Sequence, residues 1–206
     1  MKKLNEIHRK LLRTAKASCP ELTEVIKQNG VLKLRRAGEK TLFAFLVRTV
    51  AGQQLSKAAA QTIYNRLLLK CGEDEAALFD LFVNRRKRTL LSCGLSRSKA
   101  EALCRLREAC EEGVIDEKKL KKASPKEITE QISNLWGFGK WSADMVAMFY
   151  IHHPDVWPEG DGAINRGLKL LKIEDSPEIV ESFSPHRSFL ALHIWKGLDS
   201  GLICRS

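Results

Sequence analysis

The stretch ASPKEITEQISNLWGFGKWSADMVAMFYIHH, residues 123–153, carries the signals of two helices joined by a glycine-rich turn. Ser124, a proline directly after it and a glutamate three residues after it have the spacing of a capping box, which predicts that a helix begins there. This helix must end at WGFGK, where Gly137 and Gly139 allow backbone angles that other residues resist. The sequence therefore predicts a helix, a glycine-rich hairpin and a second helix.

Such a hairpin can bind an anion, because the glycines let backbone N–H groups point outward at the start of a helix. The expected donors are the amides of Gly137, Gly139 and Ser142, and Lys140 adds positive charge. A contact of this kind holds a nucleic-acid backbone without reading its sequence. The alternative is a tight turn that only needs glycine to join two helices. The basic character of the whole chain favours the DNA-binding interpretation.

Composition supports one large domain or two small lobes with a nucleic-acid partner. The chain has 206 residues, is 44% hydrophobic and carries a net charge of +10. A positive charge of this size predicts attraction to a polyanion, although many soluble proteins are also basic. No apolar run reaches the roughly 18 residues that a membrane span needs, and the basic N-terminus lacks the apolar core of a secretory signal. We therefore expect no membrane partner and a protein that is not secreted but is cytoplasmic or nuclear.

The rest of the chain is also predicted to be helical, which gives an all-α fold class. Apolar residues recur at helical spacing in 43–50 and 59–67, with Gly52 between them and Ser56 placed to cap the second helix. We find no convincing strand pattern. The basic run RRKR at 85–88 is interpreted as a solvated face. The six cysteines match no metal or iron–sulfur pattern, so reduced and mostly buried thiols are expected.

A second informative stretch is WPEGDGAINRGL, residues 157–168, where Asp161 lies between two glycines just before an expected helix. An aspartate in this position is usually an N-cap, worth about 1 kcal/mol. The alternative is a reactive carboxylate, and one residue can serve both purposes. Asp144, inside a helix, and Asp155, early in the preceding loop, are weaker candidates for such a carboxylate.

Four stretches together resemble the helix-hairpin-helix DNA glycosylase superfamily. LWGFGKWSAD followed by PEGDGAINRGL resembles its hairpin and its loop with a reactive aspartate. LVRTVAGQQLSKAAAQTI and SPHRSFLALHIW resemble motifs of the alkyladenine branch, and most of all 3-methyladenine DNA glycosylase II. The resemblance runs from about residue 40 to 197. It implies two helical lobes with an active-site cleft between them: 42–153, with the hairpin at about 125–150, and 1–41 plus 154–206.

The resemblance also assigns roles to single residues. Asp161 falls at the reactive aspartate, and Gln54 falls at the position that enters the duplex where the damaged nucleotide has left. Trp141 and Trp195 fall at aromatic positions of the base pocket. The alternatives are purely structural roles: Gln54 would be a polar residue at a helix junction, and each tryptophan would be a core residue. The resemblance further implies a monovalent cation, Na⁺ or K⁺, held by the backbone carbonyls of Ser133, Leu135 and Phe138.

Two departures from relatives refine the expected activity. Bifunctional relatives have a nucleophilic lysine where this chain has Trp141, which indicates hydrolysis without strand cleavage, although Lys140 is only one residue away. The four-cysteine iron–sulfur loop of other relatives is absent after residue 190, where Cys204 is the only cysteine. The expected protein is a monomeric, monofunctional base-excision-repair enzyme that acts on double-stranded DNA without a required cofactor.

The chemistry of base removal explains why these residue types are needed. Breaking an N-glycosidic bond builds positive charge on the sugar, and a fixed, ionised carboxylate stabilises that charge. The target nucleotide must first be flipped out of the duplex. An N-alkylated purine such as 3-methyladenine is cationic and attracts the faces of tryptophan rings. Deaminated or otherwise modified bases such as hypoxanthine or uracil, and a non-catalytic DNA-binding protein, remain alternatives.

Overall fold

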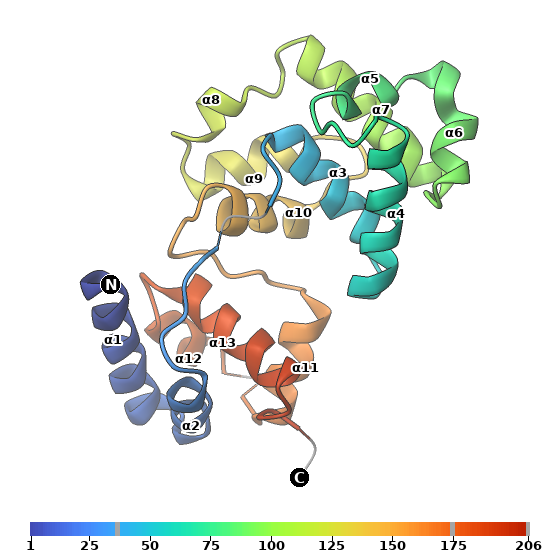
Figure 1. The fold of residues 1–206 in the computed structure, drawn as a ribbon. Helices are drawn as coiled ribbons and strands as arrows, with labels where there is room; N and C mark the ends of the chain where they lie inside the picture. The colour runs from blue at the N-terminus through green and yellow to red at the C-terminus, as the bar shows by residue number, and fades with distance from the viewer. Residues whose placement is uncertain (36–37, 174–175, 205–206) are drawn as a thin grey trace. The chain divides into compact units, whose positions relative to one another are not determined.

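The computed structural model describes residues 1–35, 38–173 and 176–204, and within these ranges it contains helices and loops but no β-strand (Figure 1). The prediction of an all-α fold is confirmed. The chain divides into two compact units. Unit 1 consists of Met1–Arg35 and His152–Ser206, and unit 2 consists of Arg36–Ile151. The expected lobe boundaries, at 42 and 153, differ from these divisions by a few residues.

Unit 2 is built around a helix that is apolar on nearly all sides. Its elements are α3 (Leu42–Gly52), α4 (Lys57–Leu69), α5 (Leu78–Leu81), η1 (Asn84–Arg86), α6 (Lys87–Ser92), α7 (Arg97–Glu111), α8 (Glu117–Leu120), α9 (Pro125–Ser133), α10 (Lys140–Met145) and the π-helical η2 (Val146–Tyr150). Eight of the eleven residues of α3 are buried, which is the pattern of a central helix rather than a surface helix. Helices α4, α7 and α10 contact it.

Local signals in the sequence set several helix starts in unit 2. Ser56, Ser96 and Ser124 each accept a backbone N–H three residues ahead, at the starts of α4, α7 and α9. The capping box of Ser124 and Glu127 is present in both directions, as predicted. The basic run 85–88 is exposed on η1 and α6, in agreement with a solvated face.

Unit 1 combines the two ends of the chain. Its helices are α1 (Lys2–Ser18), α2 (Pro20–Asn29), α11 (Gly162–Leu170), α12 (Pro177–Ser182) and α13 (Arg187–Asp199). Helix α13 contacts α2, α11 and α12. It approaches α11 very closely at Gly167, where an added Cβ would lie 2.4 Å from Cγ2 of Ile194. A side chain at position 167 would therefore force these two helices apart.

The loop before α11 is fixed to α13 by polar contacts. Asp155 accepts hydrogen bonds from the backbone N–H and the guanidinium of Arg187, and from the hydroxyl of Ser184. Burial alone would raise the pKa of the Asp155 carboxyl, but these donors hold it below its usual range. The hydroxyl of Ser188 bonds to the backbone of His153 and Val156. Asp155 and Arg187 therefore position the loop that leads to Asp161.

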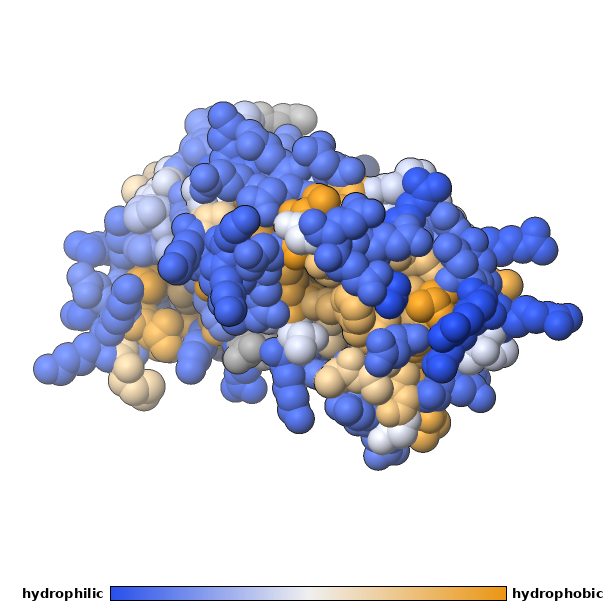
Figure 2. Space-filling model, turned by 90° about the horizontal axis from the view of Figure 1, so that it is seen from above, coloured by the Kyte–Doolittle hydropathy of each residue, from blue (hydrophilic) through white to orange (hydrophobic). Residues whose placement is uncertain are grey.

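The surface is strongly polar, as the charge of the chain requires. Figure 2 shows hydrophilic side chains over most of the face that it displays, with smaller apolar areas between them. No helix in the described part of the chain is long and apolar enough to cross a membrane. Each of the six cysteines is a free thiol, and Cys19, Cys93 and Cys104 are buried.

Stability is expected to fall in mild acid because of a buried histidine on α13. His193 is 1% exposed and its Nδ1 has no hydrogen-bond partner within the described residues. Burial, with the nearby charges of His8 and Lys196, lowers its pKa to about 3. In the unfolded chain the imidazole takes up a proton near pH 6.5, whereas in the folded protein it stays neutral until about pH 3. The free energy of unfolding is therefore unaffected by His193 above pH 6.5 and decreases as pH falls from 6.5 toward 3.

This loss can be measured by urea unfolding. Between pH 7 and pH 5, the free energy of unfolding should decrease by about 2 kcal/mol through His193 alone. The His193→Gln variant cannot titrate, so its free energy of unfolding should decrease by about 2 kcal/mol less over the same interval. An equal decrease in the variant and the wild type would assign the acid sensitivity to other groups.

Candidate functional site

Asp161 is the N-cap of helix α11. One carboxylate oxygen, Oδ1, accepts the backbone N–H groups of Ala163 at 3.0 Å and Ile164 at 2.9 Å. The partial positive charge at a helix N-terminus favours a carboxylate in this position. Asp161 is only half-buried, so its carboxylate is not sealed inside the unit. The capping role anticipated for this residue is confirmed.

A tryptophan from the C-terminal helix completes this arrangement. The indole Nε1–H of Trp195, on α13, donates to the same Oδ1 of Asp161 at 3.1 Å. Trp195 is also half-buried. The structure thus brings together two residues that the sequence selected for separate reasons. Three N–H donors hold the carboxylate in one orientation, which is the preorganisation that electrostatic catalysis requires.

The glycine-rich hairpin connects α9 to α10 in unit 2. Gly137 has φ +85°, a left-handed conformation that favours glycine, and an added Cβ would lie 2.5 Å from Cβ of Ala102. Gly139 has φ −122° and is the N-cap of α10, with open space where a Cβ would stand. Both glycines are exposed, and within the described residues their amides donate to no acceptor. This geometry leaves N–H donors available at the surface.

One predicted donor is wrong. The amide of Ser142 donates to the carbonyl of Gly139 at 3.0 Å, and the residue is only 1% exposed. It is therefore unable to bind a phosphate, because the first turn of α10 already uses this N–H group. Lys140 is 48% exposed at its side chain and forms an ion pair with the buried carboxylate of Asp144 at 3.0 Å. That pair gives Asp144 a structural partner inside its own helix.

Gln54 lies at the tip of an exposed turn between α3 and α4. Gln53 has φ −52° and ψ 130°, Gln54 has φ 58°, and the amide of Leu55 donates to the carbonyl of Gly52 at 3.1 Å. These are the features of a type II turn. The left-handed conformation of Gln54 is unusual for a residue with a side chain, and such strain often marks functional positions.

The predicted site residues are divided between the two units. Trp141 is half-buried on α10 in unit 2, whereas Asp161 and Trp195 belong to unit 1. Lys99 was not predicted as a site residue, yet its ammonium donates to the carbonyls of Ala51 and Gln53 beside the Gln54 turn. The only signal for it was a lysine three residues after the cap of α7, which does not reveal where the side chain reaches.

The hairpin also presents an aromatic residue that was not selected from the sequence. Trp136 is 49% exposed, and the guanidinium of Arg105 lies 5.0 Å from its ring centroid. An exposed tryptophan at the hairpin can contact a DNA backbone or sugar. Part of the Trp136 ring is already occupied by the cation–π contact with Arg105.

Two oxygen atoms of the segment expected to bind the cation keep unused acceptor capacity. The hydroxyl of Ser133 is buried without a hydrogen-bond partner in the part of the chain that the structure describes. The carbonyl of Leu135 accepts the N–H of Phe138 and keeps a second lone pair. Oxygen atoms of this kind suit a monovalent cation. Among the described residues, no group of three or more histidine, cysteine, aspartate or glutamate side chains forms a metal site.

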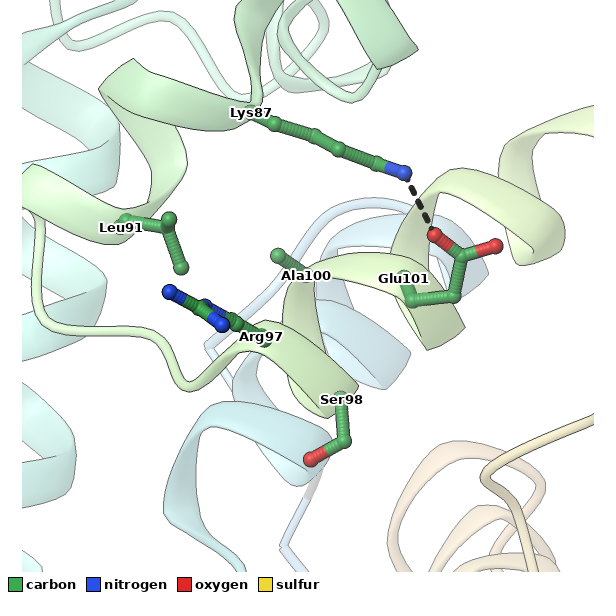
Figure 3. A pocket seen from close by; sticks show the side chains of 6 residues that line it. All are labelled: Lys87, Leu91, Arg97, Ser98, Ala100 and Glu101. Atoms are coloured by element: carbon green, nitrogen blue, oxygen red, sulfur yellow. Dashed lines mark ion pairs between the residues drawn. The ribbon is translucent and has the colours of Figure 1, made fainter.

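Two surface pockets lie away from the predicted residues. One, of about 410 Å³, lies in unit 2 between α6 and α7, and Figure 3 shows Lys87 reaching across it to Glu101. That ion pair measures 2.7 Å. The other pocket, of about 510 Å³, lies beside α11 and α13 and is lined by Arg166, Lys169 and three apolar residues. Neither pocket is lined by Asp161, Trp195, Trp141 or Gln54.

Comparison with known proteins finds relatives and solved structures that are named as DNA glycosylases. No family model matches the chain. The chain is 28% identical over 181 residues to DNA-3-methyladenine glycosylase 1 of Schizosaccharomyces pombe, covering 84% of this chain and 79% of the relative. The solved structure of the 3-methyladenine DNA glycosylase Mag1 of that organism, in complex with abasic DNA, superposes with a TM-score of 0.81 at 24% identity, covering 93% and 95% of the chains. The DNA-3-methyladenine glycosidase of Bacillus halodurans gives 0.73 at 26% identity, covering 92% and 88%.

Proposed function

We propose that this chain is a helix-hairpin-helix DNA glycosylase that hydrolyses the N-glycosidic bond of alkylated purines in double-stranded DNA, because it is similar over most of its length to DNA-3-methyladenine glycosylases. The products are the free base, of the 3-methyladenine kind, and an abasic site. The relatives that it resembles carry this substrate in their names. The observation that carries the proposal is the Asp161 carboxylate, which three N–H groups hold at the start of α11.

The reaction breaks the bond between C1′ of the sugar and the ring nitrogen of the base. The electron pair leaves with the base, and C1′ becomes cationic in the transition state. The carboxylate of Asp161 stabilises this charge, and water then adds to C1′ and loses a proton. A base that is already cationic accepts the electron pair readily, so the protein needs little acid catalysis.

Tryptophan side chains recognise the damaged base, and a glutamine side chain keeps the flipped nucleotide out of the duplex. Trp141 and Trp195 offer ring faces that attract a cationic purine, a contact worth about 0.5–2 kcal/mol. Trp195 has a second task because its N–H group holds Asp161. Gln54, exposed at the tip of its turn, fills the space that the flipped nucleotide leaves.

The hairpin binds the DNA backbone. The amides of the exposed residues Gly137 and Gly139 donate to no acceptor within the described residues, and beside the positive charge of Lys140 they hold a phosphate without reading its base. A monovalent cation bound by the carbonyls of Ser133, Leu135 and Phe138 would add positive charge beside the same phosphate. No step of the chemistry depends on that cation.

Cleavage of the DNA strand is not part of the proposed reaction. A bifunctional enzyme needs a lysine nucleophile, and Trp141 stands where such relatives place it. Lys140, the neighbouring lysine, engages Asp144 in an ion pair. An ammonium group that is paired and charged is a poor nucleophile.

A panel of DNA duplexes tests the proposed function. Each duplex contains 3-methyladenine, 7-methylguanine, hypoxanthine or uracil, and is scored for strand breaks before and after treatment with alkali. The expected result is alkali-dependent breaks, strongest at the methylated purines. Preference for hypoxanthine or uracil would assign the protein to deaminated bases, and breaks without alkali would make it bifunctional. Binding without an abasic product from any duplex would leave a DNA-binding protein as the better description.

A further inference from the structure

The turn that carries Gln54 is held in a form that its own sequence does not favour. A type II turn needs a positive φ at its third residue, a position that glycine or asparagine usually occupies. Gln54 adopts φ 58° there. The same four residues would have a relaxed Gln54 in a type I turn, which differs by a flip of the peptide between Gln53 and Gln54. A contact from another part of the unit must therefore stabilise the type II turn.

The side chain of Lys99 makes the contact that distinguishes the two forms. Its Nζ donates to the carbonyl of Gln53 at 2.8 Å and to the carbonyl of Ala51 at 3.0 Å. The Gln53 carbonyl belongs to the peptide that would flip. A positive charge is also favourable here because α3 ends at Gly52 and its last carbonyls carry partial negative charge.

The environment of Lys99 strengthens these bonds. Lys99 is half-buried on α7, and burial lowers the pKa of its amine. A partly desolvated ammonium gains more from its carbonyl acceptors than one in water does. It reaches across from α7, which packs on α3, so the position of the ammonium is set by the core of unit 2 rather than by the turn.

A second contact ties the same turn to the hairpin helix. Nε2 of Gln53 donates to the hydroxyl of Ser142 at 3.3 Å, and Ser142 lies in the first turn of α10. Gln53 is therefore fixed at both its carbonyl and its side chain. Gln54 itself is exposed, and its conformation is set by the backbone of the turn.

We infer that Lys99 is a positioning residue, which locks the Gln53 carbonyl so that the turn stays type II and presents Gln54 to DNA. This inference rests on the proposed function, in which Gln54 enters the duplex. Lys99 does not touch the reacting atoms and acts through the turn alone.

The first test measures stability and does not depend on activity. In the wild type, Gln54→Gly should raise the melting temperature by about 2–4 °C, because glycine relieves the strain at positive φ. In the Lys99→Met background the turn is free to become type I, so Gln54→Gly should give no increase. An equal increase in both backgrounds would overturn the inference. If Lys99→Met does not fold, Lys99→Gln replaces it in both tests.

The second test compares two substrates under single-turnover conditions. One duplex has 7-methylguanine opposite cytosine, and the other has the same lesion opposite an abasic site, where no partner has to be displaced. Lys99→Met should slow release from the paired lesion by about tenfold and from the unpaired lesion much less. Lys118→Met, which removes an exposed charge on α8, is the matched control and should match the wild type.

The outcomes separate the two proposals. A wild type that releases no base from either duplex contradicts the proposed function. A wild type that is active, with Lys99→Met slowing both substrates equally, shows a general structural role and contradicts the inference.

Discussion

Replacement of Asp161 by asparagine should reduce the rate of base release by about 10²–10³-fold, a loss of roughly 3–4 kcal/mol of transition-state stabilisation. The variant keeps the shape of the side chain and an oxygen that can accept the N–H groups of Ala163, Ile164 and Trp195. It lacks the negative charge that stabilises the cationic sugar in the proposed reaction. Since asparagine caps helices as well as aspartate does, stability should change by less than about 1 kcal/mol.

The measurement is single-turnover release of methylated purine, with DNA binding measured in parallel. Binding of the lesion duplex should survive, because the charge acts on the transition state and not on the ground state. Asp116→Asn is the matched control. Asp116 caps α8 through the amides of Lys118 and Lys119 in the same manner, but within the described residues no tryptophan bonds to it. Retained turnover in Asp161→Asn would mean that another carboxylate serves the reaction.

Gly137→Ala should destabilise the protein by about 2–4 kcal/mol. Two costs add: alanine resists the left-handed φ of +85°, and its Cβ would lie 2.5 Å from Cβ of Ala102 on α7. Urea unfolding measures the loss. The double variant Gly137→Ala with Ala102→Gly removes the clash but keeps the φ strain, so it should recover part of the stability beyond the sum of the single changes.

The Gly139→Ala variant tests DNA binding by the same hairpin with little effect on protein stability. Its φ of −122° suits any residue and no atom lies within 4 Å of the added Cβ, so the loss of stability should stay at or below about 1 kcal/mol. In the proposed complex the methyl group adds bulk beside the amide that binds the phosphate, so affinity for DNA should fall. Unchanged affinity in a folded Gly139→Ala variant would refute the phosphate-binding role of the hairpin.

Features that depend on neighbours in the chain could be predicted from the sequence. The capping box at Ser124, the cap at Ser56 and the N-cap at Asp161 each join residues two or three positions apart. The local pattern of residue types is sufficient for such contacts. Local reasoning still failed at Ser142, because the amide that was expected to face a phosphate closes the first turn of α10.

The sequence alone thus determined the helical class, the hairpin and the carboxylate to examine, because helix periodicity, caps and glycine turns are encoded within a few consecutive residues. The tertiary structure decided what holds the candidate site. Trp195 reaches Asp161 across 34 positions of sequence, Lys99 reaches the Gln53 carbonyl across 46, and Gln53 reaches Ser142 across 89. A periodic pattern states which face of a helix is buried, but packing of the whole unit determines which distant side chain lies against it.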